Sequence, residues 1–179
     1  MPDTPPPADL ADIELIVFDV DGVLTDGTLH IHPDGGQSKS FHLRDGLAIV
    51  QARKVGLEVA ICSGRADDAT LHRMNRLGVE RMIRGSKDKG ADVTELAKQS
   101  GVPLAKTAFV GDDLLDLPAM RNVGLAMCPA DAAEDVKRRV HRVLDTPGGY
   151  GVAREAIEAI LQARGLWQSI VQRLSGEHA

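Results

Sequence analysis

Residues 13–27 read Ile-Glu-Leu-Ile-Val-Phe-Asp-Val-Asp-Gly-Val-Leu-Thr-Asp-Gly, so that a short apolar run ends in two carboxylates. Side chains of an extended chain alternate between its two faces, and Asp19 and Asp21 can therefore point into one crevice. The Gly and Thr that follow suit a tight turn beneath a small anion. The segment predicts a strand that carries a nucleophile and a general acid/base to a site at its end.

Further apolar runs alternate with segments of helical period, which is typical of a parallel sheet flanked by helices. The expected strands are Leu15–Val20, Leu57–Cys62, Val79–Ile83, Thr107–Val110 and Leu125–Cys128. The expected helices are Leu47–Lys54, Asp68–Leu77, Lys87–Gln99, Leu114–Asn122, Ala132–Val136 and Val152–Ala163. A left-handed cap is common just past a helix, and the glycines at such places are Gly56, Gly78, Gly101 and Gly124. The pattern predicts an α/β fold, a Rossmann-like parallel sheet with helices on both faces.

One stretch breaks the alternation. Gly27–His32 and Lys39–Leu43 are short extended runs around Pro33-Asp34-Gly35-Gly36, which predicts a β-hairpin insertion. The hairpin occupies the place where a larger lid could sit, but it is too small to fold as a domain of its own. We therefore expect no cap domain.

The composition bounds the function. At 179 residues, with 43% hydrophobic and 26% charged residues, the chain has the size of one domain with a single core. Aromatic residues make up 3% and the net charge is -5, so no nucleic-acid partner is expected. No apolar stretch approaches the roughly 20 residues that span a bilayer, so no membrane partner is expected either.

Three segments are expected along the chain. Residues 1–12 are Pro-rich and acidic without an apolar stretch, and we expect a flexible leader there and not a signal peptide. Residues 13–164 form the expected main domain, and residues 165–179 a C-terminal tail. Cys62 and Cys128 lie within apolar runs, which favours buried reduced thiols over a disulfide.

Polar residues follow several expected strands, where open α/β sheets bind their ligands. Ser63-Gly64-Arg65 offers a hydroxyl and backbone N–H groups, and Gly111-Asp112-Asp113 adds carboxylates ahead of a helix. Lys87 and Lys89 open the helix between these segments; either alone is more often solvated, and the order of the motifs favours Lys89. His42–Gly46 is a polar patch where the hairpin returns to the domain.

The charges indicate phosphoryl chemistry. A phosphate monoester would be repelled by Asp19, Asp21 and Asp112 together, and Mg²⁺ bound by carboxylates, water and the phosphate removes that repulsion. A lysine adds a compact positive charge at the transferring group. Asp19 can then attack phosphorus and form an aspartyl-phosphate. Asp21 can protonate the leaving oxygen and later take a proton from the hydrolytic water.

This order of motifs resembles that of the haloacid dehalogenase superfamily of phosphohydrolases and, within it, of the capless 3-deoxy-D-manno-octulosonate 8-phosphate phosphatases. The matching segments are residues 19–27, 41–46, 63–65, 89, 111–113 and 148–155. They extend over most of the chain, from about Leu15 to Gly165. Arg44-Asp45-Gly46 and Gly148-Gly149-Tyr150-Gly151 narrow the resemblance to the subfamily, so residues 13–164 are expected to be a phosphatase domain of this type.

The resemblance implies a role for each residue. Asp19 would be the nucleophile and a Mg²⁺ ligand, Asp21 the acid/base with its backbone carbonyl on the metal, and Asp112 the remaining ligand. Ser63 and Lys89 would hold the phosphoryl oxygens, completing the catalytic set. The expected substrate-binding residues are Asp21, His42, Leu43, Arg44, Asp45, Gly46, Arg65, Arg73 and Lys89, with Asp113 and Asp116 in supporting roles.

The implied activity is Mg²⁺-dependent hydrolysis of 3-deoxy-D-manno-octulosonate 8-phosphate in lipopolysaccharide precursor synthesis. The resemblance also implies a cytoplasmic homotetramer assembled by the hairpins, in which a neighbouring subunit covers the open site. Two departures concern the substrate, since Val50 replaces a basic residue and His42 an Asn found in some relatives. The alternatives are another sugar-acid phosphate, such as a nonulosonate 9-phosphate, and a non-catalytic phosphatase-like partner domain.

Several of these residues also have a structural interpretation. An EF-hand loop is excluded, because it requires glycine at the sixth position and Gly22 is at the fourth. Asp113 and Asp116 can equally cap the following helix, and Arg73 can equally form only a salt bridge. His30 and His32 alternate on the hairpin, where a subunit or solvent contact is favoured over a metal pair.

The tail has its own pattern. Trp167, Ile170, Val171 and Leu174 recur at helical spacing after Gly165. A helix there could pack on its own domain or dock on a neighbouring subunit. Contact with another subunit is slightly favoured.

Overall fold

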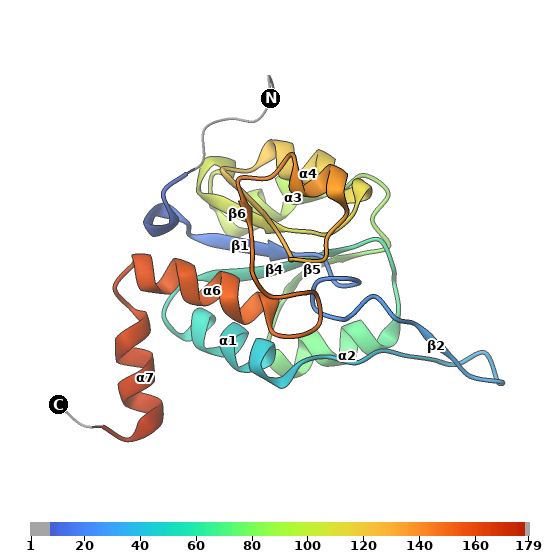
Figure 1. The fold of residues 1–179 in the computed structure, drawn as a ribbon, viewed down its shortest axis with the longest axis horizontal. Coiled ribbons are helices and arrows are strands. Elements are labelled where there is room, and N and C mark those ends of the chain that lie inside the picture. The colour runs from blue at the N-terminus through green and yellow to red at the C-terminus, as the bar shows by residue number, and fades with distance from the viewer. Residues whose placement is uncertain (1–7, 178–179) are drawn as a thin grey trace.

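The computed structural model describes residues 8–177, and its centre is a parallel six-stranded sheet in the order β5-β4-β1-β6-β7-β8 (Figure 1). The strands are β1 (Leu15–Phe18), β4 (Glu58–Ser63), β5 (Arg81–Arg84), β6 (Thr107–Val110), β7 (Leu125–Cys128) and β8 (Arg142–Val143). Val17 of β1 pairs with Ala60 on one side and with Phe109 on the other. The predicted α/β fold is confirmed.

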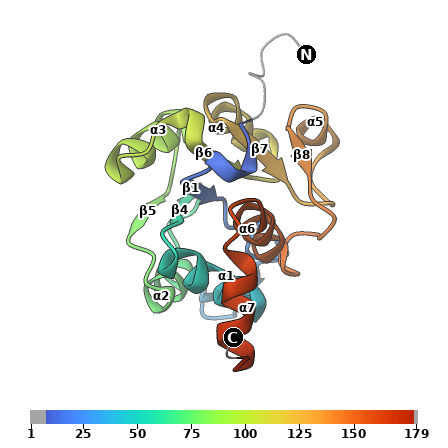
Figure 2. The same cartoon turned by 90° about the vertical axis from the view of Figure 1, so that its left-hand side faces the viewer.

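Helices cover both faces of this sheet (Figure 2). One layer consists of α1 (Leu43–Lys54), α2 (Asp68–Leu77), α6 (Val152–Ala163) and α7 (Trp167–Ser175), and the other of α3 (Lys89–Ser100), α4 (Leu117–Asn122) and α5 (Glu134–Lys137). Ile16 and Phe18 of β1 belong to the hydrophobic cluster of the first layer, and Leu15 and Val17 to that of the second. A strand covered on both faces is apolar without interruption, which explains the run that precedes Asp19.

The strand order creates a crevice beside β1. From β1 the chain first builds outward to β4 and β5, then returns to add β6, β7 and β8 on the other side. Connections from β1 and β6 therefore leave in opposite directions, and open α/β sheets bind ligands at such a point, outside the carboxyl ends of the strands.

The hairpin forms, but with a shorter second strand than expected. β2 (His30–Ile31) pairs antiparallel with β3 (Gln37–Ser38), and the hairpin extends away from the sheet (Figure 1). The expected strand at Lys39–Leu43 was wrong, because the Lys39 side chain is 1% exposed and turned into the domain, and α1 already begins at Leu43. Residues 39–42 connect the hairpin to that helix.

Other boundaries also differ from those expected. α1 begins ahead of the expected Leu47, after the extended residue His42 at its N-cap. A 3-10 turn at Leu114–Asp116 precedes α4. β8 is absent from the sequence-based expectation because its two exposed residues show no apolar alternation.

One of the expected glycine caps is wrong. Gly56, Gly78 and Gly101 follow their helices with φ of +81°, +73° and +67°, as predicted. Gly124 does not adopt a positive φ; a side chain there would collide with the backbone oxygen of Ala105. Gly124 is thus required by the close approach of two backbone segments.

The two ends of the described chain pack on the domain. Residues 1–7 of the expected leader lie outside the described residues, whereas Leu10–Asp12 form a 3-10 turn and Leu10 contacts the core. In α7, Trp167 is 9% exposed and Ile170 is fully buried in the same cluster as α6. The tail helix thus packs on its own domain through this face, while Leu174 remains 54% exposed; contact with another subunit stays a prediction.

Two other observations concern the core and the helices. Cys62 and Cys128 are buried and free, as predicted, and burial raises their pKa values to about 12 and about 11. Within residues 8–177, the helices are all too short or too polar to cross a bilayer.

Candidate active site

Asp19 lies directly after β1, at the crevice between β1 and β6. Its backbone N–H donates to the Val110 carbonyl at 2.9 Å, and its side chain is 9% exposed. The chain then turns sharply, because the N–H groups of residues 23–25 all donate to the Val20 carbonyl, at 3.3, 2.9 and 3.0 Å. The Asp-x-Asp-Gly segment thus presents Asp19 at a strand end, as expected from its sequence.

Three carboxylates converge at this point. Asp19, Asp112 and Asp116 each bring an oxygen within 4.8 Å of the others, and Asp116 is 1% exposed. Gly22 has a φ of +86°, and a side chain on it would collide with the Asp112 carboxylate. The glycine of the first motif therefore allows the acidic segment after β6 to approach the turn after β1.

Among the described residues, Lys89 supplies the only ammonium within hydrogen-bonding distance of this cluster. It begins α3, which Asp88 caps by accepting from the N–H groups of Gly90 and Ala91 at 3.0 and 3.1 Å. The Lys89 Nζ donates to Asp19 Oδ1 at 2.9 Å and to Asp116 Oδ1 at 2.5 Å. Lys87 is exposed, so the lysine that the structure brings to the carboxylates is Lys89, which the motif order favours.

The charge balance of the cluster fits a divalent cation. Burial, and then repulsion by Asp116, raises the pKa of Asp19 to about 7, and the same two causes raise the pKa of Asp112 to about 7. Burial alone would lower the pKa of Lys89, but Asp19 and Asp116 raise it above its ordinary value, so the ammonium persists. Three carboxylates against one ammonium leave an excess of negative charge, and hard carboxylate oxygens are the donors that Mg²⁺ prefers.

Asp116 orients the cluster, and Asp113 caps the following turn. Asp116 Oδ2 accepts from the N–H groups of Asp112 and Asp113 at 2.9 and 3.2 Å, while its Oδ1 receives Lys89. Asp113 is exposed and accepts from the N–H of Leu114 at 2.7 Å. The sequence left capping and metal ligation equally open for both; the structure separates them, since Asp116 joins the acidic cluster and Asp113 does not.

The neighbouring strand supplies Ser63 and Arg65. Ser63 ends β4 and is fully buried, with its Oγ accepting from the Arg65 N–H at 3.2 Å. The Arg65 Nε lies 3.9 Å from Asp21 Oδ2, and its Nη2 donates to Gln37 Oε1 of the hairpin at 2.9 Å. The loop after β4 thus faces the turn after β1, which is the placement expected from the strand ends.

Asp21 has a partner that sequence reasoning missed. The Lys39 Nζ lies 2.7 Å from Asp21 Oδ1 and 3.0 Å from its Oδ2, and donates to Asp67 Oδ2 at 2.6 Å. Lys39 is 18 residues from Asp21 in the chain, in the connection that follows the hairpin. No local pattern marks such a contact.

The segment His42–Gly46 is only partly available for a substrate. Leu43 and Arg44 are exposed, but Asp45 is 3% exposed and its Oδ1 accepts from the Arg154 N–H at the start of α6 at 2.7 Å. Gly46 is covered by the Arg73 guanidinium, with which a side chain at this position would collide. Arg73 thus lies against this segment, and Asp45 is hydrogen-bonded to the start of α6. Contacts of Arg73 and Asp45 with a substrate stay a prediction.

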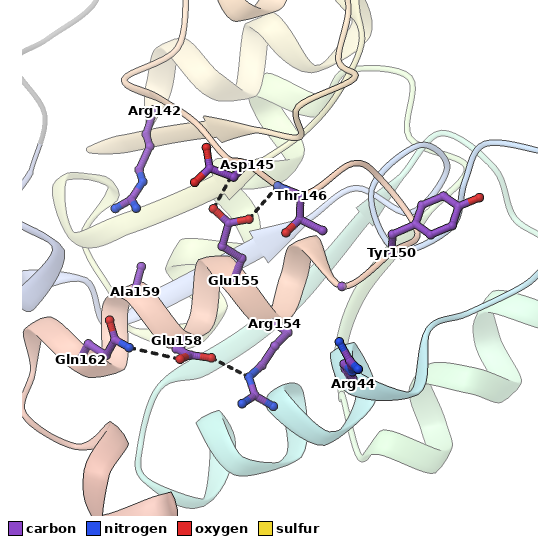
Figure 3. Close-up of a pocket in the computed structure, with 11 residues that line it drawn as sticks. Arg44, Arg142, Asp145, Thr146, Tyr150, Arg154, Glu155, Glu158, Ala159 and Gln162 are labelled. Carbon is purple, nitrogen blue, oxygen red and sulfur yellow. Dashed lines mark hydrogen bonds and ion pairs between the residues drawn. The ribbon is translucent and has the colours of Figure 1, made fainter.

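A groove of about 520 Å³ adjoins this segment; it lies along α6 and the loop that precedes it, with Arg44 of α1 at one end (Figure 3). Arg44 and Tyr150 lie at one end and Gln162 at the other, and Glu155 fixes the loop between them by accepting from the N–H groups of Asp145 and Thr146 (Figure 3). The lining contains none of the clustered carboxylates. The groove is therefore separate from the carboxylate cluster and adjoins the expected substrate loop through Arg44.

Comparisons with known proteins agree with this geometry. Residues 40–124 match the haloacid dehalogenase-like hydrolases. The 3-deoxy-D-manno-octulosonate 8-phosphate phosphatase of Haemophilus influenzae is 43% identical over 156 residues, which is 87% of either chain. Its cobalt-bound structure is similar with a TM-score of 0.90 and 39% identity, over 95% of this chain and 99% of that one. The Moraxella catarrhalis enzyme, solved with magnesium, phosphate and KDO, has a TM-score of 0.90 and 31% identity, over 93% and 95%.

Proposed function

This chain belongs to the haloacid dehalogenase-like hydrolases, in the family of 3-deoxy-D-manno-octulosonate 8-phosphate phosphatases, and we propose that it hydrolyses 3-deoxy-D-manno-octulosonate 8-phosphate to the free sugar acid and phosphate. The observation that carries the proposal is the buried Asp19 carboxylate, 2.9 Å from Lys89 within a cluster that fits a divalent cation. That arrangement places a nucleophile where a phosphoryl group can be neutralised.

Two carboxylates share the chemistry. An Asp19 oxygen forms a bond to phosphorus while the ester P–O bond breaks, and Asp21 gives a proton to the departing sugar oxygen. Water then attacks the aspartyl-phosphate and loses a proton to Asp21, which releases phosphate and restores Asp19. Ser63 and Lys89 hold the phosphoryl oxygens during both steps.

The residues proposed to hold the metal are those that the resemblance implies, and the carboxylate cluster supports Asp19 and Asp112 among them. Asp19 and Asp112 would hold Mg²⁺ through their carboxylates and Asp21 through its backbone carbonyl, while Asp116 orients Asp112 and Lys89. When bound, Mg²⁺ supplies positive charge that offsets the repulsion between carboxylates and phosphate.

The sugar acid would contact the loop that starts α1. Arg44, Arg65 and Arg73 supply positive charge for a carboxylate, and His42, Leu43, Asp45 and Gly46 form the adjoining segment. Val50 and His42 depart from some relatives at this side of the site, which favours keeping a nonulosonate 9-phosphate as a second candidate substrate. The complete set of Asp19, Asp21, Lys89 and Asp112 argues against a non-catalytic domain.

Assembly and location complete the proposal. A cytoplasmic homotetramer that acts in lipopolysaccharide precursor synthesis would bury exposed apolar side chains of the hairpin, of the start of α1 and of the loop before α6. These side chains are Ile31 (69% exposed), Leu43 (78%) and Tyr150 (62%). Light scattering after size exclusion measures the assembly directly.

A panel of sugar-acid phosphates, ranked by kcat/KM with and without Mg²⁺, tests the activity. We expect the octulosonate 8-phosphate to rank first and turnover to require the metal. A higher rank for a nonulosonate 9-phosphate would reassign the substrate while retaining the chemistry. Absence of phosphate release from every ester with Mg²⁺ would overturn the proposed function.

A further inference from the structure

The acid/base residue Asp21 is held by a buried lysine of the hairpin connection. The Lys39 Nζ lies within hydrogen-bonding distance of both Asp21 oxygens, at 2.7 and 3.0 Å, and the Lys39 side chain is 1% exposed. The Asp21 side chain is 29% exposed and stays open to a ligand. Lys39 thus holds the Asp21 carboxylate through both oxygens while part of the side chain stays accessible; the Arg65 Nε lies further away, 3.9 Å from Oδ2.

Lys39 is itself fixed to a helix. It donates to Asp67 Oδ2 at 2.6 Å, and Asp67 caps α2 by accepting from the Thr70 N–H through its other oxygen at 2.9 Å. Burial alone would raise the pKa of Asp67, but the hydrogen bonds from Lys39 and Thr70 lower it. Asp21 is therefore connected through Lys39 to the N-terminus of a ten-residue helix.

The same contact determines where the hairpin lies. β2 and β3 contain two residues each, and an isolated two-stranded hairpin is marginally stable in water. Its described side-chain anchors on the domain are the Lys39 pairs and the Gln37–Arg65 hydrogen bond at 2.9 Å. Arg65 is 45% exposed, whereas Lys39 is buried, so the lysine is the stronger anchor.

We propose that Lys39 is a positioning residue for phosphoryl transfer: it orients the Asp21 carboxylate toward the leaving oxygen and couples that orientation to the placement of the hairpin. The inference rests on the proposed function, because it assigns Lys39 a part in the step in which Asp21 protonates the leaving group. Lys39 itself touches neither phosphorus nor the leaving oxygen.

The dependence on the leaving group distinguishes positioning from folding. An alkyl phosphate needs a proton on its leaving oxygen, whereas p-nitrophenolate leaves without one. For Lys39→Met in the full chain, we expect kcat/KM to fall about 30-fold or more for the sugar-acid phosphate and less than about threefold for p-nitrophenyl phosphate, within the range of general acid catalysis. kcat/KM is chosen because it reports the first transfer to Asp19 and excludes later hydrolysis.

Five further variants complete the test. Asp21→Asn should show the same selective loss, and Lys39→Met combined with Asp21→Asn should be no worse than Asp21→Asn alone. Lys39→Arg should retain most of the kcat/KM for the sugar-acid phosphate. Lys106→Met removes the exposed Lys106–Glu14 pair at 2.6 Å and should leave kcat/KM unchanged for both substrates. Lys39→Gln retains a polar chain and should reproduce the effect if Lys39→Met unfolds.

The outcomes separate this inference from the proposed function. Equal losses on both substrates would show that the lysine only supports the fold. No loss in Lys39→Met and Lys39→Gln would show that the lysine is not needed for transfer, and either result would overturn the inference. Wild-type protein that hydrolyses neither ester with Mg²⁺ would overturn the proposed function itself.

Discussion

At the scale of single residues, the site depends on an imbalance of buried charge. Asp19, Asp112 and Asp116 face one ammonium, that of Lys89, in a region that is largely removed from water. A buried charge is costly unless it is paired, so three carboxylates in this place disfavour the metal-free fold and favour binding of a dication. The residues proposed to carry the chemistry thus limit the stability of the metal-free protein.

Asp19→Asn should abolish turnover without disrupting the fold. The variant lacks the oxygen nucleophile, and we expect kcat to fall at least about a thousandfold. Because burial raises the pKa of Asp19, loss of its charge should not lower the melting temperature of the metal-free protein. Steady-state phosphate release and thermal unfolding measure the two effects, and substantial retained turnover would refute the nucleophile assignment.

Asp116→Asn should weaken metal binding although Asp116 is not required as a ligand. The variant loses one of the two carboxylate charges that hold Lys89 and changes the acceptor for the Asp112 N–H. Loss of comparable hydrogen-bond partners of metal ligands costs about 10–100-fold in metal affinity. Titration of activity with Mg²⁺ gives the apparent affinity. Asp113→Asn is the matched control, because asparagine can still cap the turn, and equal effects of the two variants would contradict the distinction.

At the scale of elements, loops bring the catalytic groups together through close backbone contacts. The turn after β1 meets the loop before α6, where the Gly149 N–H donates to the Val23 carbonyl at 2.8 Å. A side chain on Gly148 would collide with the Gly22 backbone. The Gly-Gly-Tyr-Gly segment therefore packs on the turn that carries Asp21. Its first two glycines are needed because larger residues would not fit against that turn.

Gly149→Ala should destabilise the protein more than Gly165→Ala. Both glycines have positive φ, +74° and +69°, but a side chain on Gly149 would collide with the Thr25–Asp26 backbone while the space at Gly165 is open. We expect a loss of about 1–2 kcal/mol for Gly165→Ala and about 3 kcal/mol for Gly149→Ala. Denaturant unfolding measures both, and equal losses would show that the collision is relieved by a small shift.

At the scale of the whole molecule, the tail helix belongs to the core of the domain. The Arg154 guanidinium lies 4.4 Å from the centre of the Trp167 ring, and the Arg173 Nη2 donates to Gln51 of α1 at 2.7 Å. With Ile170 buried, α7 closes the layer formed by α1 and α6. Removal of the tail would therefore disturb the fold before it could report on assembly.

Paired substitutions in α7 separate its two faces. Ile170→Ala should lower the free energy of unfolding by about 2–4 kcal/mol, because it leaves a cavity in the core. Leu174→Ala, at a 54% exposed position, should change it by less than about 0.5 kcal/mol. Denaturant unfolding measures these values, and light scattering shows whether Leu174→Ala alters assembly. An unchanged stability of Ile170→Ala would contradict the observed packing.

By itself, the sequence determined the parallel sheet, the strand end that carries Asp19 and Asp21, and the candidate metal and phosphate residues. These features are local: apolar runs mark strands, and the carboxyl ends of parallel strands meet at one edge whatever the details of packing. The same local signals could not mark β8, which is short and exposed, or the role of Gly124, which depends on a distant carbonyl.

Only the tertiary structure decided which charged groups meet. It selected Lys89 over Lys87 and Asp116 over Asp113, placed α7 on its own domain, and brought Lys39 to Asp21. The Lys39 and Lys89 pairs join side chains at least 18 residues apart in the chain, on elements whose relative placement comes from packing of the whole core. Hydrophobic periodicity specifies an element and its buried face but not the distant charge that its polar side chains will meet, and in this chain those distant charges complete the candidate site.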